Sequence, residues 1–471
     1  MRMAKRRMIL IRPMHGEEIK GFVTSASFPT AHLGCRLELF LLRPAEMSNK
    51  AAPPSKKNFV RRFFSVLGPG LITGAADDDP SGIATYSIAG AQMGTSLLWT
   101  AFITWPLMGC VQFMCARIGM VTGTGLAATL KQKFPRWVLV IFALALFAAN
   151  TINVGSDLAG MSDAAEMLTG FNSHWFVVLF GIAIALSTVY FHYFQIAKAL
   201  KWLALFLFAY VVTAFVLQPN WRAVLRDTFI PSWPKGHDAW QSFVAILGTT
   251  ISPYLFFWQA SEEVEEEKAM GRRMLRHREG ATGQEIDNRR LDVGVGTFFS
   301  NIVMYFVILT CALTLHAHGM RDIETSKQAA EALKPLAGSL AYILYTVGLI
   351  GVGFLAIPTL TGSSAYAFAE TFHWREGLDL PFKSAHYFYG VVILSALLGI
   401  GMDFAGINPI KALFWTAILN GLVAPFLLVG ILIVVSDRKL MQNQPSSWLS
   451  RIVVGITALV MFGAAVAMFV L

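Results

Sequence analysis

The stretch "DDDPSG" (residues 77–82) places three carboxylates and a helix breaker in the middle of an otherwise apolar segment. A charged side chain at mid-bilayer costs at least a few kcal/mol, and an unwound turn leaves backbone polar groups unpaired. Both features are tolerated where they face a cavity or a bound ion. The stretch therefore predicts an interrupted membrane helix that offers carboxylate and carbonyl oxygens to a cation.

Asp79 is the preferred ligand in this stretch because it directly precedes Pro80, where the helix is expected to unwind. Successive unwound residues point in different directions. Asp77 or Asp78 is therefore expected nearer the vestibule, and Asp78 is also kept as a candidate ligand. Gly82 is expected to help open the turn and free its carbonyl groups for a cation.

A second interruption is expected in the stretch "GTTISPYLF" (residues 248–256), where Gly248 and Pro253 flank small hydroxyl residues. Carboxylate, carbonyl and hydroxyl oxygens together suit a hard cation. The alternative is that each break is only a kink in a membrane helix, with its acids paired to basic residues.

The composition is that of an all-α integral membrane protein. The 471 residues are 55% hydrophobic and only 14% charged, with a mean hydropathy of +0.55. Soluble proteins carry about 25% charged residues, and membrane β-barrels alternate polar and apolar positions. The net charge of +9 is attributed to basic residues on the cytoplasmic side. Nucleic-acid binding is not expected, because no basic and aromatic module lies outside the apolar segments.

About eleven apolar segments have the length of a membrane-spanning helix. They are expected at 65–90, 93–116, 137–158, 175–191, 200–217, 240–263, 293–315, 338–369, 385–402, 410–435 and 452–471. The two interruptions fall in the first and sixth segments, which begin two successive groups of five. Broken helices at matching positions of two halves indicate a secondary transporter built as a 5+5 inverted repeat, with its substrate between the breaks.

The chain is expected to comprise a disordered cytoplasmic tail, residues 1–62, and a transmembrane transporter domain, residues 63–471. Residues 1–46 are either a spurious extension of the reading frame or part of that tail, since the sequence from Met47 resembles a natural N-terminus. Most of the 38 Lys and Arg residues fall in the tail and in loops on the same side. The positive-inside rule then predicts a multi-pass protein of the inner membrane, with a cytoplasmic N-terminus and an external C-terminus.

At these residues the chain resembles the NRAMP family of divalent-metal transporters. The "GPG" at 68–70 and the pair Asp79-Pro80 match the family's first helix, whose motif is Asp-Pro-Gly-Asn, with Gly82 at the Asn position. The likeness extends over about residues 60–470 and includes "SDLAG" at 156–160. It implies a LeuT-type fold with eleven helices and a divalent cation as substrate, with no cofactor.

The departures from the family motif indicate the metal. In the sixth segment the family has Ala-x-x-Met-Pro-His, in which the Ala carbonyl and the Met sulfur bind metal. Here the aligned residues are Thr249, Ser252, Pro253 and Tyr254, so a hydroxyl replaces the thioether. An all-oxygen site suits Mg²⁺, Mn²⁺ or Ca²⁺. The pattern is similar to the NRAMP-related magnesium transporters, and it implies that Thr249 and Ser252 are ligands.

The family's proton route is also altered. Its third helix carries Asp-Leu-Ala-Glu, of which Asp157 matches the first acid, while Gly160 replaces the second. Tyr254 replaces a histidine and cannot exchange protons near neutral pH as histidine can. Metal uptake without proton coupling is therefore expected. Asp157, Tyr254 and Asn420 are kept as proton or gating candidates, although a lone Asn in a membrane helix commonly forms a helix–helix hydrogen bond.

The run "EEVEEEK" (residues 262–268) ends the sixth segment. It is interpreted either as a solvated helix end or as an acidic exit path, in which Glu262 and Glu263 raise the local cation concentration. The leading hypothesis is uptake of a hard divalent cation by a monomer or weak homodimer. The alternatives are a LeuT-type permease for an organic substrate and a cation channel with acidic rings. No nucleophile–base pair or phosphate-binding loop is present, so an enzyme is not expected.

Overall fold

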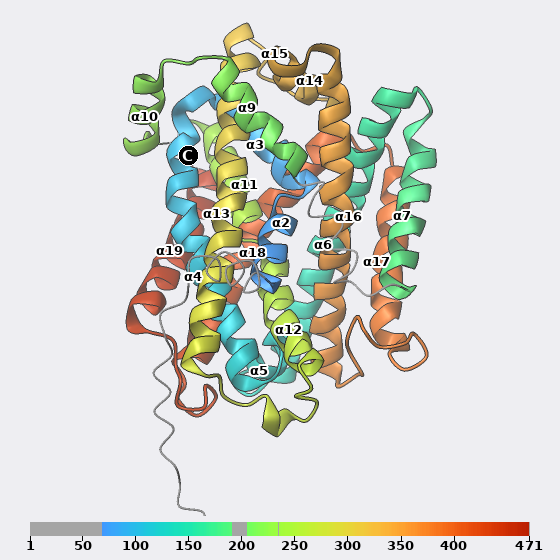
Figure 1. Ribbon diagram of the computed structural model, residues 1–471, viewed down its shortest axis with the longest axis vertical. Coiled ribbons are helices and arrows are strands. Elements are labelled where there is room, and N and C mark those ends of the chain that lie inside the picture. The colour runs from blue at the N-terminus through green and yellow to red at the C-terminus, as the bar shows by residue number, and fades with distance from the viewer. Residues whose placement is uncertain (1–67, 191–204, 234, 471) are drawn as a thin grey trace, which may run out of the picture. The chain divides into compact units, whose positions relative to one another are not determined.

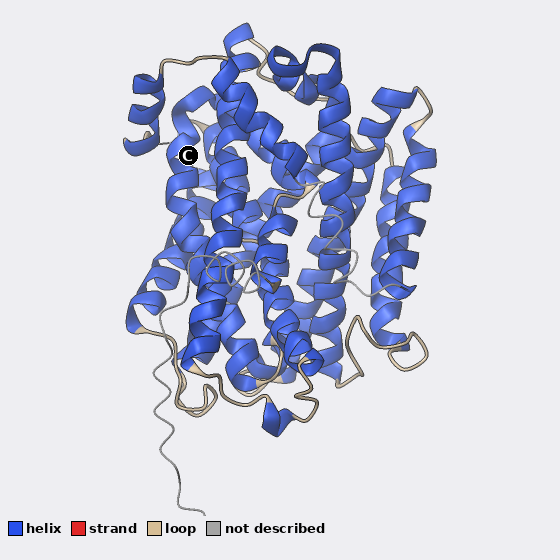
Figure 2. Ribbon diagram, viewed as in Figure 1, coloured by secondary structure: helices blue, strands red, loops and turns tan. Residues whose placement is uncertain are grey.

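The computed structural model describes residues 68–190, 205–233 and 235–470. All regular structure within these ranges is helical, and no strand occurs in them (Figure 2). The expected tail at 1–62 and the beginning of the expected fifth segment, residues 200–204, lie outside the described residues. Many large apolar side chains on the outward faces are exposed, among them Leu179, Leu459 and Phe469. Such exposure is typical of surfaces that contact lipid rather than water.

The described helices overlap the expected segments, but Arg136–Thr169 and Gly283–Thr314 extend about ten residues beyond the expected bounds. Figure 1 shows their arrangement. They are α2 (Pro69–Asp77), α3 (Pro80–Met93), α4 (Leu98–Thr122), α6 (Arg136–Thr169), α7 (Ser173–Tyr190), α9 (Phe208–Val216), α11 (His237–Thr250), α12 (Pro253–Ala269), α13 (Gly283–Thr314), α16 (Ala341–Phe372), α17 (His386–Asp403), α18 (Pro409–Ser436) and α19 (Trp448–Val470). Shorter helices in the connections are α5 (Leu126–Leu130), α10 (Trp221–Phe229), α14 (Ser326–Ala330) and α15 (Lys334–Ala337).

Nine helical runs among the described residues are long and apolar enough to cross a membrane. One of them joins α3 and α4 into the single run Pro80–Thr122. The nine residues of α9 are too few to span, and part of the chain before them is not described. The expected number of eleven spans therefore stays a prediction.

Both expected interruptions are present. Between α2 and α3 only Asp78 and Asp79 are non-helical, and between α11 and α12 only Ile251 and Ser252 are. Each second half-helix begins with a proline, which has no N–H to leave unpaired in a first turn and whose ring fixes φ near the helical value. The same local chemistry thus produces a break in both helices.

The half-helices are held by close backbone packing. The α2 helix lies along α13, and α11 lies along α18 (Figure 1). A Cβ atom on Gly74 would overlap the backbone of Gly296, and one on Gly248 would overlap the backbone of Ala417 and Gly421. Small residues allow membrane helices to approach this closely. Glycine at these positions therefore fixes each broken helix against an unbroken neighbour.

Candidate metal site

The Asp79 carboxylate lies at the first break and is buried, with 2% of the residue exposed. One oxygen accepts the Gly82 N–H at 2.6 Å, which caps α3. The other accepts the side-chain amide of Asn153 on α6 at 3.1 Å. Asn153 in turn accepts the hydroxyl of Thr416 on α18 at 2.9 Å. Helices far apart in the sequence therefore fix the orientation of this carboxylate.

Oxygens from both breaks converge at Gly82. A Cβ atom built there would lie 3.2 Å from the Asp77 carbonyl oxygen, 3.3 Å from Thr249 Oγ1 and 3.4 Å from Asp79 Oδ1. The structure thus brings together Asp79, Gly82 and Thr249, three of the residues expected from the sequence. A carboxylate, a carbonyl and a hydroxyl around one glycine form an oxygen-only environment of the kind that hard cations prefer.

Ser252 lies at the second break and is buried. Its hydroxyl oxygen lies 2.7 Å from the carbonyl oxygen of Gly248 and 2.8 Å from that of Thr249. Its single proton is donated to one of these carbonyls, which leaves oxygen lone pairs for a cation. The role of Ser252 as a ligand stays a prediction.

Asp77 and Asp78 do not face a vestibule. Only 0% and 4% of these residues are exposed, so that expectation is wrong. The hydroxyl of Ser300 on α13 lies 2.7 Å from Asp77 Oδ2 and 3.2 Å from Asp78 Oδ1. The reason is that α2 remains helical through Asp77 and packs against α13. Asp78 therefore lies against α13, and its carboxylate contacts Ser300 rather than the groups that hold Asp79.

The three proton or gating candidates are all buried. The Asp157 carboxylate lies near the backbone N–H of Ser81, and the Asn420 side-chain oxygen has no hydrogen-bond partner among the described residues. The Tyr254 hydroxyl donates to the carbonyl oxygen of Ala76 at 3.1 Å, linking α12 to the last turn of α2. Tyr254 therefore makes a structural contact between the two breaks, while the roles of Asp157 and Asn420 stay predictions.

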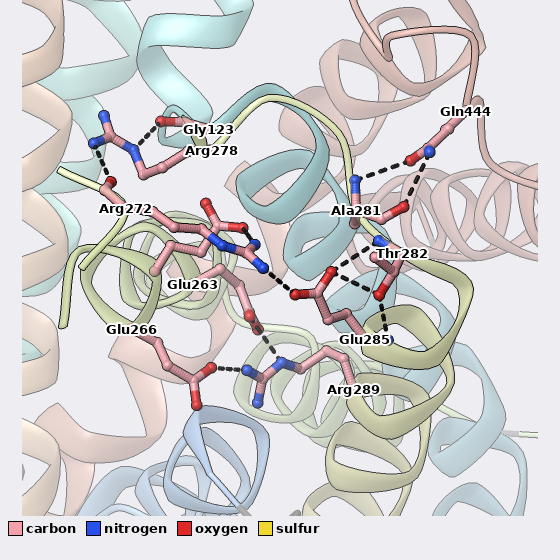
Figure 3. Close-up of polar contacts among 11 residues, drawn as sticks. Gly123, Glu263, Glu266, Arg272, Arg278, Ala281, Thr282, Glu285, Arg289 and Gln444 are labelled. Carbon is pink, nitrogen blue, oxygen red and sulfur yellow. Dashed lines mark hydrogen bonds and ion pairs between the residues drawn. The ribbon is translucent and has the colours of Figure 1, made fainter. Parts of the chain in front are cut away.

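A second acid-rich region surrounds Arg289 on α13. We call Arg289, Glu263, Glu266 and Asp292 the Arg289 cluster. Arg289 lies 2.7 Å from Glu263 and 2.6 Å from Asp292, and it also pairs with Glu266. Figure 3 shows its guanidinium between the two α12 glutamates. The cluster joins α12 to α13.

Asp292 extends this cluster to the first helix. Its carboxylate accepts the backbone N–H groups of Gly68 at 2.8 Å, Gly70 at 2.8 Å and Leu71 at 3.1 Å. These are the unpaired donors at the start of α2, which attract negative charge. The beginning of α2 is thereby fixed to α13, and through Arg289 to α12.

The structure corrects the interpretation of residues 262–268. Glu262 and Glu263 are buried, with 3% and 1% exposed, so they do not form a solvated helix end. Glu263 is ion-paired rather than free. A cavity of about 360 Å³ lies beside it and is lined by Glu266, Glu267 and Glu285, among others. Whether Glu262 and Glu263 belong to an exit path stays a prediction.

Arg272, in the connection after α12, also lines this cavity. It pairs with Glu267 and Glu285, and the hydrogen bond that it donates to Glu285 raises the pKa of its guanidinium (Figure 3). The cavity acids therefore have basic partners within the chain.

Sequence reasoning missed Asn153, Thr416, Ser300, Arg289 and Asp292. The available signal was polar residues within apolar helices, but their partners lie more than seventy positions away in several cases. Among the described residues, no group of three or more His, Cys, Asp or Glu side chains has the geometry to hold a metal ion. A metal at the breaks therefore depends on carbonyl and hydroxyl oxygens beside the carboxylates.

Comparison with known proteins decides the family. The sequence model described as natural resistance-associated macrophage protein-like, or Nramp, matches residues 70–471. The chain belongs to the Nramp family. This Nramp chain is 26% identical over 407 residues to the divalent metal cation transporter MntH of Klebsiella pneumoniae, covering 84% of this chain and 92% of the relative. It is 24% identical over 403 residues to MntH of Caldanaerobacter subterraneus, covering 83% and 90%.

Solved structures agree on the fold. The Eremococcus coleocola manganese transporter, in complex with an aromatic bis-isothiourea compound, matches with a TM-score of 0.67 at 17% identity, covering 91% of this chain and 97% of that one. MhsT in complex with L-phenylalanine matches with a TM-score of 0.51 at 15% identity, covering 84% and 98%. The expected family and LeuT-type fold are confirmed. This Nramp protein is a multi-pass membrane transporter and not an enzyme.

Proposed function

We propose that this Nramp protein takes up hard divalent cations, Mg²⁺ or Mn²⁺, by alternating access. Asp79, Thr249, Ser252 and the backbone oxygens near Gly82 bind the ion. The observation that supports this most is the convergence of the Asp77 carbonyl, Thr249 Oγ1 and Asp79 Oδ1 around Gly82. The relatives named as divalent metal cation transporters and the structure of a manganese transporter support the substrate class.

The choice of a hard ion rests on ligand chemistry. The oxygens near Gly82 belong to a carboxylate, a hydroxyl and a backbone carbonyl, and Ser252 adds a second hydroxyl. Soft thioether ligands favour softer transition metals, whereas oxygen ligands favour Mg²⁺, Mn²⁺ and Ca²⁺. Mg²⁺ also keeps several of its waters when it binds. The resemblance to the NRAMP-related magnesium transporters likewise depends on the replacement of the family's Met by Ser252 and of its His by Tyr254.

Alternating access is supported by the burial of the site. Asp79, Thr249 and Ser252 are each 3% exposed or less, which favours an occluded carrier over an open channel. The Arg289 cluster closes the end of the molecule at which the basic α12–α13 connection lies. By the positive-inside rule this end is cytoplasmic, and release of the ion requires α2 to separate from Asp292.

The driving force is the cation gradient together with the membrane potential. For a divalent ion the potential contributes about 4.6 kcal/mol at 100 mV. Gly160 and Tyr254 replace the acid and the histidine of the family's proton route, so no proton is carried through. An organic permease is disfavoured, because such sites direct helix N-termini at a substrate carboxylate, which the carboxylates at this break repel.

Uptake by the full chain in liposomes tests the proposal. We expect saturable uptake of Mg²⁺ and Mn²⁺, with no acidification of the lumen reported by a trapped pH dye. The absence of divalent-cation uptake would contradict the substrate assignment. Flux that fails to saturate would indicate a channel, and acidification that follows metal uptake and is lost in Asp157→Asn would show that proton coupling persists.

A further inference from the structure

The carboxylates of the first break lie on two different sides. Asp79 contacts Asn153 on α6 and lies close to Thr249 on α11. Asp77 and Asp78 both contact Ser300 on α13, at 2.7 Å and 3.2 Å from its hydroxyl oxygen. The two groups of carboxylates are adjacent. The backbone carbonyl oxygen of Asp77 lies near Gly82 together with the Asp79 carboxylate, whereas the Asp77 carboxylate contacts Ser300.

The Ser300 side lacks positive charge. A serine hydroxyl has one proton and can donate to only one of the two carboxylate oxygens that it contacts. Asp77 Oδ1 is buried and has no hydrogen-bond partner among the described residues. The charged groups that act on Asp77 and Asp78 are other aspartates of the same break, and neither forms an ion pair with a described lysine or arginine. Buried carboxylates without compensation are strongly unfavourable.

We infer that Asp77, Asp78 and Ser300 form a second binding position for a divalent cation, beside the Asp79 site. Two carboxylates balance the charge of one divalent ion, the serine oxygen adds a further hard ligand, and waters retained by the ion would fill the remaining positions. This inference rests on the proposed function, since it assumes that Asp79 binds the transported ion. The two ions then bind on opposite sides of one unwound turn, and the Asp77 residue contributes to both positions.

The two positions should be coupled. An ion at the Ser300 side neutralises the charge next to Asp79 and fixes α2 against α13 through Ser300. Loss of the ion on the Ser300 side leaves the ligands of the Asp79 position in place, because replacing Asp77 by asparagine keeps its backbone carbonyl. The variant Asp77→Asn/Asp78→Asn is therefore expected to bind one ion where the unmodified protein binds two.

Counting bound Mn²⁺ tests the inference. The purified full chain in detergent is dialysed against Mn²⁺, and free Mn²⁺ is measured by its electron paramagnetic resonance signal. We expect two bound ions per chain, one in Asp77→Asn/Asp78→Asn and one in Asp79→Asn. The exposed loop residue Asp322 provides the matched control, and Asp322→Asn should bind two.

The outcomes separate the inference from the proposed function. One ion bound by the unmodified protein and by Asp77→Asn/Asp78→Asn, but none by Asp79→Asn, would overturn the second position and leave the proposed function in place. No ion bound by the unmodified protein would overturn both. The ion retained by the double variant also shows that this variant folds. Ser300→Ala should weaken Mn²⁺ binding only at the position formed by Asp77, Asp78 and Ser300. Unchanged affinity at that position would show that Ser300 is not one of its ligands.

Discussion

Two acid-rich regions of this protein differ in how their charge is balanced. At the first helix break, Asp77, Asp78 and Asp79 are buried with hydrogen bonds but without an ion pair to a described basic residue. In the Arg289 cluster, the acids contact a single buried guanidinium. Acids that are already paired hold helices together. Acids that are buried without a counter-charge are either protonated or neutralised by a cation from outside the chain, and this separates a candidate cation site from a structural contact.

The largest expected effect is on stability, in the paired region. Breaking a buried ion pair by removing one partner costs about 3–5 kcal/mol. Arg289→Met leaves three acids without their partner and should lower the midpoint of thermal unfolding in detergent by many degrees. The neighbouring Arg290 is exposed, and Arg290→Met should unfold like the unmodified protein. Equal unfolding midpoints for the two variants would mean that the Arg289 cluster does not hold the helices.

At the first helix break, removal of an acid is not expected to destabilise the protein. Asp79→Asn removes an uncompensated buried charge, so the metal-free protein should be at least as stable as the unmodified one. Ligand linkage predicts that Mn²⁺ at about 100-fold its Kd stabilises the unmodified protein by about 2.7 kcal/mol. Unfolding followed with and without Mn²⁺ measures both effects. Stabilisation by Mn²⁺ that persists undiminished in Asp79→Asn would place the ion elsewhere.

A methyl group at Gly82 should block the metal site without unfolding the helix. Its Cβ would lie 3.2–3.4 Å from three oxygens of the site. Overpacking costs about 1–3 kcal/mol, which corresponds to a loss of metal affinity of about 5-fold to 150-fold if the bound ion bears the whole cost. Gly294→Ala, on an open face of α13, is the matched control. Competition of unlabelled metal against radioactive uptake reports the affinity, and normal affinity of Gly82→Ala would exclude this position.

A smaller change in selectivity is expected at the second break. Ser252→Met introduces a soft sulfur ligand and should raise the affinity for Cd²⁺ relative to Mg²⁺ by about 1 kcal/mol. Thr250→Met tests whether any nearby thioether suffices, because the Thr250 hydroxyl donates within its own helix to Ile246. Uptake competition between the metals checks the prediction, and strong Cd²⁺ preference in the unmodified protein would contradict the hard-ion assignment.

The breaks could be predicted from sequence because their causes are local. A proline beside aspartates, or beside small hydroxyl residues, ends and restarts a helix without help from distant residues. Asp79 was identified in this way, whereas Thr249 was proposed from the resemblance to the family motif, and Gly82 lies in the first turn of α3 rather than in the break. The position of Asp77 and Asp78 was not identified, because it depends on the glycine-mediated packing of α2 on α13. Arg289 and Asp292 likewise acquire their roles only when α2, α12 and α13 meet.

Uptake by Asp79→Asn in liposomes, compared with Asp322→Asn, tests the assignment of the transported ion most directly. Both variants remove one carboxylate, but only Asp79 lies among the converging oxygens of the two breaks. With equal amounts of folded protein in the vesicles, we expect Mn²⁺ and Mg²⁺ uptake to fall to the level of empty liposomes in Asp79→Asn and to be unchanged in Asp322→Asn. Normal uptake by Asp79→Asn would show that this carboxylate does not bind the transported ion.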